Sequence, residues 1–135
     1  KPRDTWLGLL HGAGIPCGAI RSVGEVCEAP QLIERGMVQS VAQVAPHFEH
    51  ALHGLKGVKN VIDIRNYGLA GAIQIAPRDG DAIVRPFDAA MKLWKAGFYV
   101  RFGGDTLQFG PTFNSKPQDL DRLFDAVGEA LNQID

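Results

Sequence analysis

The order of apolar periodicities from residue 40 onward constrains the fold of this chain more than any other feature. Apolar residues recur every three to four positions in some segments, which predicts helices, and alternate with polar residues in shorter ones, which predicts strands. The resulting order of helix, two strands, helix, two strands, helix predicts an α/β chain of the α+β type. We expect a small, mostly antiparallel sheet of about four strands with helices packed on it. The predicted segments are 40–55, 60–65, 70–76, 86–96, 98–102, 106–109 and 117–134.

Two local signals concern the first helix and the first strand. Pro46 lies inside the helical segment and should kink or split it, because its ring removes a backbone donor and clashes with the preceding turn. Ile62 and Ile64 alternate with Asp63 and Arg65. This alternation predicts both isoleucines on the buried face of the strand.

Two further signals concern the later helices. Pro86 suits the first position of the middle helix. Ser115 and Gln118 have the spacing of a capping box at the start of the final helix. One apolar stripe is expected along the middle helix, formed by Phe87, Ala90, Met91 and Trp94.

The first 38 residues carry only short elements. Asp4 is a good N-cap for a first helix that ends near Gly12. Residues 15–20 should be extended, and two more short helices are expected at 22–27 and 30–35. Elements this short bury little apolar surface by themselves.

Charge is balanced along the chain. The 135 residues include 14 Lys and Arg against 15 Asp and Glu, which gives a net charge of −1. Without a basic patch there is no electrostatic footprint for nucleic acid or for an anionic membrane, so neither is expected as a partner. No apolar stretch approaches the ~20 residues of a membrane span, and no leader peptide is evident. We therefore expect a cytoplasmic protein.

The cysteines and histidines do not form a metal-binding pattern. Cys17 and Cys27 lie outside any CxxC pairing, and in an otherwise cytosolic composition they are expected to be free thiols. His47, His50 and His53 recur every third residue. Positions i and i+6 point to different sides of a helix, so one helix cannot bring all three imidazoles together. We expect surface histidines and no metal site.

Arg101 is the side chain with the clearest binding potential. It is expected on the strand face opposite Val100 and Phe102, directly before the turn Gly103-Gly104. A guanidinium there could grip a carboxylate with two parallel hydrogen bonds, and the glycines would let a ligand approach closely. A solvated or salt-bridged arginine explains the same pattern, and spacing alone favours that second interpretation. No nucleophile–base set or carboxylate pair points to catalysis.

Most of residues 39–135 falls within two recognisable stretches, VIDIRNYGLAGAIQIAPRDGDAIVRPFDAAMKLWKAGFYVRFGGDTLQFGPTFN and DLDRLFDAVGEALN. In them the chain resembles the C-terminal small domain of class III, fold-type I, pyridoxal-phosphate aminotransferases of the omega-amino acid (β-alanine) to pyruvate type. The resemblance implies an aminotransferase small-domain fold. It also implies that Arg101 binds the carboxylate of the amino or keto acid substrate.

The same resemblance implies pyridoxal phosphate as the cofactor of the parent enzyme. That chemistry needs a lysine Schiff base, an acidic residue at the pyridinium nitrogen and phosphate donors, which the family supplies from its large domain. No lysine of this chain matches the family's cofactor motif, so no catalytic, cofactor-binding or metal-binding residue is assigned. We expect no cofactor to bind the chain alone. The lysines are Lys1, Lys56, Lys59, Lys92, Lys95 and Lys116.

The beginning of the chain carries two other stretches, RDTWLGLLHGAGIPCGAIRSVGEV and PQLIERGMV. Over about residues 2–38 the chain resembles family III CoA-transferases. The catalytic aspartate of that family lies in a part outside this segment, and Asp4 does not stand in for it.

The two resemblances predict a CoA-transferase-like segment at 1–38, joined near Met37-Val38 to an aminotransferase small domain at 39–135. The expected function is that of a fragment or fusion carrying the substrate-carboxylate-binding domain, inactive alone, whose parent moves an amino group from an omega-amino acid to pyruvate. Two alternatives stay open: a non-catalytic structural or engineered module, and a CoA-transferase fragment. Small-domain surface that would pack on a large domain should be exposed and apolar, so we expect a homo-oligomer.

Overall fold

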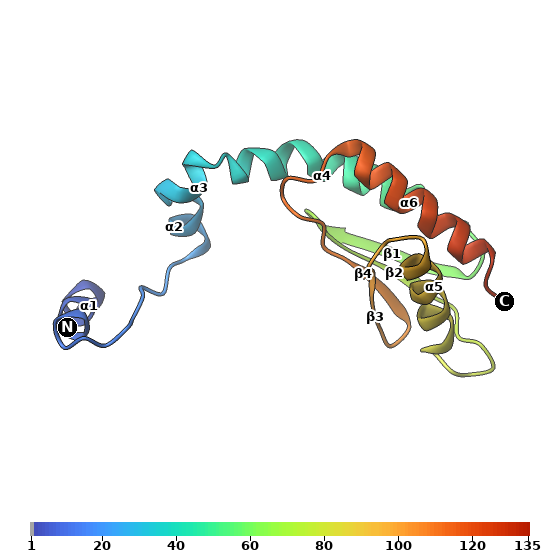
Figure 1. Cartoon of the computed structure of the whole chain (residues 1–135), viewed down its shortest axis with the longest axis horizontal. Helices are drawn as coiled ribbons and strands as arrows, with labels where there is room; N and C mark the ends of the chain where they lie inside the picture. The colour runs from blue at the N-terminus through green and yellow to red at the C-terminus, as the bar shows by residue number, and fades with distance from the viewer. Residues whose placement is uncertain (1) are drawn as a thin grey trace. The chain divides into compact units, whose positions relative to one another are not determined.

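The chain has two compact units, Lys1–Val38 and Gln39–Asp135 (Figure 1). The computed structural model describes residues 2–135. The first unit contains the short helices α1 (Arg3–Gly12), α2 (Val23–Cys27) and α3 (Pro30–Glu34), none of which has a buried residue. The described residues of this unit therefore form no buried core.

One expectation for the first unit, the N-cap of its first helix, is wrong. Pro2 is the N-cap of α1, because its ψ of 154° is extended rather than helical and the helix begins at the next residue, Arg3. Asp4 instead lies in the first turn and pairs with Arg3 at 3.5 Å. Residues 15–20 belong to no helix or strand.

Helix α2 lies where a short helix was predicted, and a capping box begins it. The Ser22 hydroxyl accepts a hydrogen bond from the Glu25 N–H (3.3 Å), and the Ser22 N–H donates to the Glu25 carboxylate (2.8 Å). The Arg3 guanidinium donates to the same carboxylate at 3.0 Å. The Ser22 N–H first, and Arg3 after it, hold the pKa of the Glu25 carboxyl below its usual range.

Acidification should therefore destabilise the first turn of α2. A carboxylate whose pKa is lower in the folded state stabilises that state above its ordinary pKa, and the contribution is lost as pH falls through the folded value. We expect the backbone amide resonances of α2 (Val23–Cys27) to lose their helical shifts in that acidic range. The Glu25→Gln variant should show no such transition, and an identical transition in that variant would contradict the assignment.

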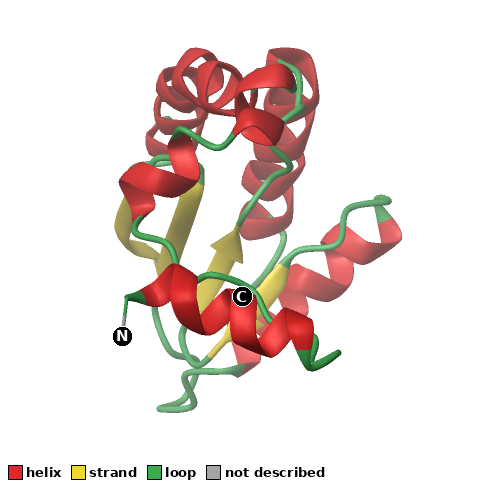
Figure 2. Cartoon of the chain, turned by 90° about the vertical axis from the view of Figure 1, so that its left-hand side faces the viewer, coloured by secondary structure: helices red, strands yellow, loops and turns green. Residues whose placement is uncertain are grey.

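The second unit follows the predicted order of elements. Its strands pair in the order β1-β2-β4-β3, and every neighbouring pair is antiparallel, which confirms the α+β fold with a four-stranded antiparallel sheet. Figure 2 shows strands in yellow and helices in red. Pairing of β2 with β4 joins the two predicted hairpins. The elements are α4 (Met37–His53), β1 (Val61–Tyr67), β2 (Ala70–Ile75), α5 (Val84–Lys95), β3 (Arg101–Gly103), β4 (Thr106–Phe109) and α6 (Pro117–Asn132).

Helix α4 is not split at Pro46, which was one of the two predicted effects of this proline. The helix runs unbroken from Met37 to His53 with Pro46 inside it. Packing explains this outcome, because Phe48 and Leu52, in the half that follows the proline, are fully buried. Burial of two large apolar side chains offsets the backbone hydrogen bond that proline removes.

The predicted alternation in β1 is wrong at Ile62. A β-bulge between Val61 and Asp63 shifts the register against β2, so one extra residue interrupts the alternation of faces. Ile62 is consequently 58% exposed, whereas Val61 and Ile64 pack against the core.

Helices α5 and α6 begin differently from prediction. Val84 is the first residue of α5, so Pro86 is the third rather than the first. Lys116 is the N-cap of α6 without a side-chain hydrogen bond, because the Ser115 hydroxyl is engaged with Thr112 at 3.1 Å. The predicted stripe on α5 is also rotated, since Pro86, Ala89, Ala90 and Leu93 are buried, while Phe87, Met91 and Trp94 remain largely exposed.

The core lies between one face of the sheet and the helices. Phe124 of α6 contacts the rings of Phe48 in α4 and Phe109 in β4, with centroid distances of 5.5 and 5.3 Å. Gly71 of β2 is essential to this packing, because a Cβ there would lie 2.7 Å from Leu52 Cδ2 and 2.8 Å from Phe48 Cζ. Figure 1 shows α4 and α6 running side by side on the same side of the strands. Among the described residues of the second unit, no helix covers the opposite face of the sheet.

Candidate functional site: Arg101 on the open face of the sheet

The register of the strands places Arg101 on this open face. Arg101 pairs with Gln108, and its neighbour Phe102 pairs with Leu107. Leu107 is fully buried on the core face, and successive side chains of a strand point to opposite faces. Arg101 and Gln108 therefore share the open face, and both are exposed. Val100 is buried, as the predicted alternation requires.

The Arg101 guanidinium makes no hydrogen bond or ion pair within residues 2–135. Three other arginines of the same unit are engaged. Arg65 donates to Asp63 at 3.0 Å, Arg78 to Asp88 at 2.7 Å, and Arg85 to the Ala76 carbonyl at 2.9 Å. Arg101 is thus a fully charged group whose five N–H donors remain available to a ligand.

The backbone beside Arg101 keeps the approach open. Residues Gly103 and Gly104 follow directly, and Gly104 has φ +56°, a conformation that favours glycine. The Thr106 hydroxyl donates to the Gly103 carbonyl at 2.9 Å and ties the turn together. A carboxylate could reach the guanidinium here without meeting a bulky side chain from the turn, which is the arrangement suited to a bidentate contact.

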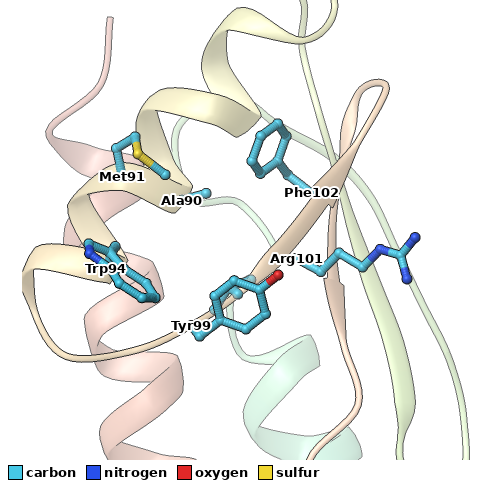
Figure 3. A pocket seen from close by; sticks show the side chains of 7 residues that line it. Ala90, Met91, Trp94, Tyr99, Arg101 and Phe102 are labelled. Atoms are coloured by element: carbon cyan, nitrogen blue, oxygen red, sulfur yellow. The ribbon is translucent and has the colours of Figure 1, made fainter.

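An aromatic pocket lies on the other side of β3, between this strand and α5. Its volume is about 240 Å³. Figure 3 shows Arg101 extending away from Met91 and Trp94, so only the stem of the arginine contributes to this pocket. Trp94 and Tyr99 meet edge to face at 5.9 Å and are 62% and 80% exposed. Phe87 and Phe102 form a similar pair at 5.7 Å.

The sequence analysis expected exposed apolar surface but did not predict that it would lie here. It placed Phe87, Met91 and Trp94 on one stripe, and that pattern is equally typical of a buried helix face. Their exposure depends on which stripe the sheet covers, and this information is not local. The surface defined by Phe87, Met91, Trp94 and Tyr99 is called the α5–β3 patch below.

His47 and His53 contact different partners. His47 Nε2 lies 2.7 Å from Asp121 of α6, and His53 Nε2 lies 2.9 Å from Asn66 of β1. Both contacts connect α4 to a neighbouring element. Within the described part of the chain, no three His, Cys, Asp or Glu side chains gather as they would around a metal ion. Cys17 and Cys27 are free thiols.

Pyridoxal phosphate does not fit the residues around Arg101. An amine for the Schiff base and a carboxylate for the pyridinium nitrogen are both required. The side chains that line the pocket beside Arg101 include neither a lysine nor an acid. Lys59 instead donates to the Ile134 carbonyl at 3.0 Å, and Lys92 donates to Gln133 at 3.4 Å. No cofactor step can be assigned to these residues.

No helix within residues 2–135 has both the length and the apolar character that crossing a bilayer requires.

Comparison with curated proteins finds aminotransferases. Over 103 residues, which are 76% of the chain, the sequence is 84% identical to an omega-amino acid–pyruvate aminotransferase of Pseudomonas putida. It is 76% identical over 103 residues to a beta-alanine–pyruvate aminotransferase of Pseudomonas aeruginosa. The chain spans only 23% of the length of each of these relatives. The resemblance to the omega-amino acid–pyruvate type is confirmed for that part of the chain.

Comparison with solved structures gives the same fold. An omega-transferase from Vibrio fluvialis JS17 matches with a TM-score of 0.69 at 23% identity, over 75% of this chain and 26% of that one. An adenosylmethionine-8-amino-7-oxononanoate aminotransferase from Methanocaldococcus jannaschii matches with a TM-score of 0.68 at 23% identity, over 77% of this chain and 25% of that one. The predicted small-domain-like architecture is therefore confirmed.

The beginning of the chain matches a different family. The family model of CoA-transferase family III covers residues 1–62, so this resemblance is also confirmed. The match extends past residue 38, through α4 and into the first residues of β1. It overlaps the aminotransferase match, because 62 and 103 residues together exceed the 135 of the chain.

Proposed function

We propose that residues 39–135 are the substrate-carboxylate-binding small domain of an omega-amino acid–pyruvate aminotransferase, and that Arg101 receives the carboxylate of the substrate. The observation that carries the proposal is an unpaired arginine on the open face of a sheet, in a chain 84% identical to such an enzyme over 103 residues. The two alternatives are weaker. A purely structural module does not account for the 84% identity to an aminotransferase, and a CoA-transferase fragment does not account for the second unit.

The chemistry of the ligand supports this assignment. An omega-amino acid carries its carboxylate at the end of the molecule opposite the reacting amine. A guanidinium that binds the carboxylate would therefore fix the distance of the amine from the catalytic group. Pyridoxal phosphate supplies the amino-transfer chemistry when it is bound, and in this proposal the rest of the enzyme holds it. Arg101 orients the substrate, and the open sheet face forms one wall of the site.

A graft into a complete relative tests the proposal. The 103 matched residues of the Pseudomonas putida aminotransferase would be replaced by those of this chain, and transamination from β-alanine to pyruvate measured. We expect activity close to that of the relative. The 135-residue chain alone, with added pyridoxal phosphate, should give no turnover. A folded graft that binds the cofactor but does not turn over β-alanine would refute the proposal.

Residues 1–38 are proposed to be a CoA-transferase-like segment of separate ancestry, joined to the small domain near Met37-Val38. Support comes from the family match at 1–62 and from the separate compact unit Lys1–Val38. None of the three helices there has a buried residue. CoA transfer is not proposed for this chain. The free thiols of Cys17 and Cys27 support a cytoplasmic location.

The α5–β3 patch is proposed to make the chain self-associate when no other domain covers it. Trp94 is 62% exposed and Tyr99 80% exposed, and exposed apolar surface favours association. We expect the apparent mass in light scattering to rise with concentration. Trp94→Glu should reduce this rise, while Tyr67→Glu, at an exposed position of β1 outside the patch, should not. A strict monomer at all concentrations would contradict the prediction.

A further inference from the structure

Strand β1 is an outer strand of the sheet, and it has the longer of the two free edges. The strand order places β1 and β3 at the edges of the sheet. Strand β3 has only 3 residues, whereas β1 has 7. Within residues 2–135, no strand pairs with the outer edge of β1. Such an edge presents a row of backbone N–H and C=O groups with which another strand can pair.

The hairpin that joins β1 to β2 determines which backbone groups face outward. Tyr67 pairs with Ala70 across a turn of two residues, and the closing pair of such a hairpin exchanges both of its hydrogen bonds. Hydrogen-bonded and non-hydrogen-bonded pairs alternate along the two strands. Arg65 and Asp63 therefore direct their N–H and C=O groups towards β2, and Ile64 directs its own towards the free edge.

Charges of both signs flank Ile64 on this edge. Asp63 and Arg65 are exposed on the open face of the sheet, while Ile64 pairs with the buried Ile73 and lies on the core face. Charged side chains often protect an edge strand from pairing, and an identical strand is repelled where like charges meet. Here an acid and a base lie at equal distances from Ile64, so the edge is complementary to the same edge of a second copy.

We propose that the free edge of β1 is a dimerisation surface, on which β1 of a second copy of this chain pairs antiparallel about a two-fold axis at Ile64. Each Ile64 N–H then donates to the Ile64 carbonyl of the other copy. The same register sets Asp63 of each copy opposite Arg65 of the other, in non-hydrogen-bonded pairs whose side chains lie closest. The Arg65 guanidinium, which contacts Asp63 of its own strand at 3.0 Å, gains a second carboxylate.

The short length of the paired segment makes this a weak dimer. Pairing uses residues 62–66 of each copy, because the bulge between Val61 and Asp63 ends the regular strand. Stable interfaces usually use about 20–30 residues a side, so this contact belongs to the weak class. Tyr67 follows the paired segment, and its replacement should leave the dimer intact. Ile62 lies inside the segment, and pairing would cover part of a side chain that is 58% exposed.

Charge reversal combined with sedimentation equilibrium tests the proposal. The full chain is measured up to a concentration of about 1 mM, in the Trp94→Glu background, which reduces association through the α5–β3 patch. Asp63→Arg and Arg65→Asp should each raise the Kd of the dimer at least about tenfold, because each sets like charges opposite one another at two positions. An equimolar mixture of these two variants should regain the original Kd, because opposite charges then meet at both positions.

The matched control is Arg122→Asp, at an exposed position of α6. It should leave the Kd unchanged. It has the same net charge as Arg65→Asp, so it also serves as the control for the mixture. Mixed with Asp63→Arg, it should give a weaker dimer than Arg65→Asp gives, because one of the two positions keeps like charges. Equal recovery with both partners would show attraction between net charges and would overturn the proposal.

Amide hydrogen exchange gives a second measurement on the same samples. We expect the protection of the Ile64 N–H to rise with protein concentration, while that of the Arg65 N–H, which already faces β2, stays constant. A chain that stays monomeric at about 1 mM, or charge reversals that leave the Kd unchanged, would overturn the proposal. Circular dichroism of each variant verifies the fold, and Asp63 and Arg65 are exposed, so their replacement should leave the core intact.

Discussion

The Phe124→Ala variant is expected to lower the free energy of unfolding of the second unit by about 3–5 kcal/mol, the usual cost of truncating a buried phenylalanine. Phe124 is 3% exposed. Its ring contacts Phe48 of α4 at 5.5 Å and Phe109 of β4 at 5.3 Å. The truncation would leave a cavity where two helices meet the sheet, and the loss is large for a domain whose total stability is roughly 5–15 kcal/mol.

Urea unfolding followed by circular dichroism measures this effect, with the midpoint and slope fitted together. The matched control is Phe113→Ala, because Phe113 is half exposed in the loop before α6. We expect the control to lose less than about 1 kcal/mol. Equal losses for the two variants would show that Phe124 is not at the centre of the core.

In the grafted aminotransferase, Arg101→Ala should lower kcat/KM for β-alanine about 100-fold. Removing one partner of a hydrogen-bonded charge pair costs roughly 2–5 kcal/mol when the site is closed from water, and each 1.4 kcal/mol corresponds to about tenfold. Arg101→Lys should recover only part of the loss. An ammonium keeps the charge but lacks the planar fork of a guanidinium.

Steady-state kinetics with β-alanine at saturating pyruvate provide the measurement. Arg122→Ala, on the exposed surface of α6, is the matched arginine control and should leave kcat/KM unchanged. A loss of similar size in Arg122→Ala would point to general destabilisation. An Arg101→Ala graft with undiminished kcat/KM would show that Arg101 is not part of the substrate-binding site.

The fold of the second unit could be predicted because its signals are local. Ile73 and Ile75 alternate with polar or small residues and are fully buried. Leu120, Phe124 and Val127 follow the helical period and are buried as well. Each of these patterns depends only on the period of its own element. The predicted hairpins follow from the turns that connect neighbouring strands.

The incorrect structural predictions concern positions whose structure depends on contacts with distant parts of the chain. Pro46 stays within an unbroken helix because the residues after it are buried against the sheet and α6. Ile62 is exposed because a bulge forms against β2. On α5, the sheet covers Ala89 and Leu93 rather than Met91, and the local period cannot distinguish these stripes.

The candidate site could be predicted only in part from the sequence. The position of Arg101 opposite Val100 follows from alternation alone. That spacing favoured a solvated arginine, and it was the family resemblance that indicated a substrate contact. The juxtaposition of Arg101 with Gln108 depends on the register between β3 and β4, which the turn at Gly103-Gly104 sets. No local signal predicted the exposed α5–β3 patch.

The most direct test of the account is the preference of the grafted enzyme for a substrate with a carboxylate. Propylamine matches β-alanine in length but has a methyl group where β-alanine has its carboxylate. We predict that the graft prefers β-alanine in kcat/KM by about 100-fold, and that Arg101→Ala reduces this ratio to about one by slowing only β-alanine. If Arg101→Ala leaves the ratio of the two kcat/KM values unchanged, whether both values fall equally or neither falls, the claim that Arg101 binds the substrate carboxylate is contradicted.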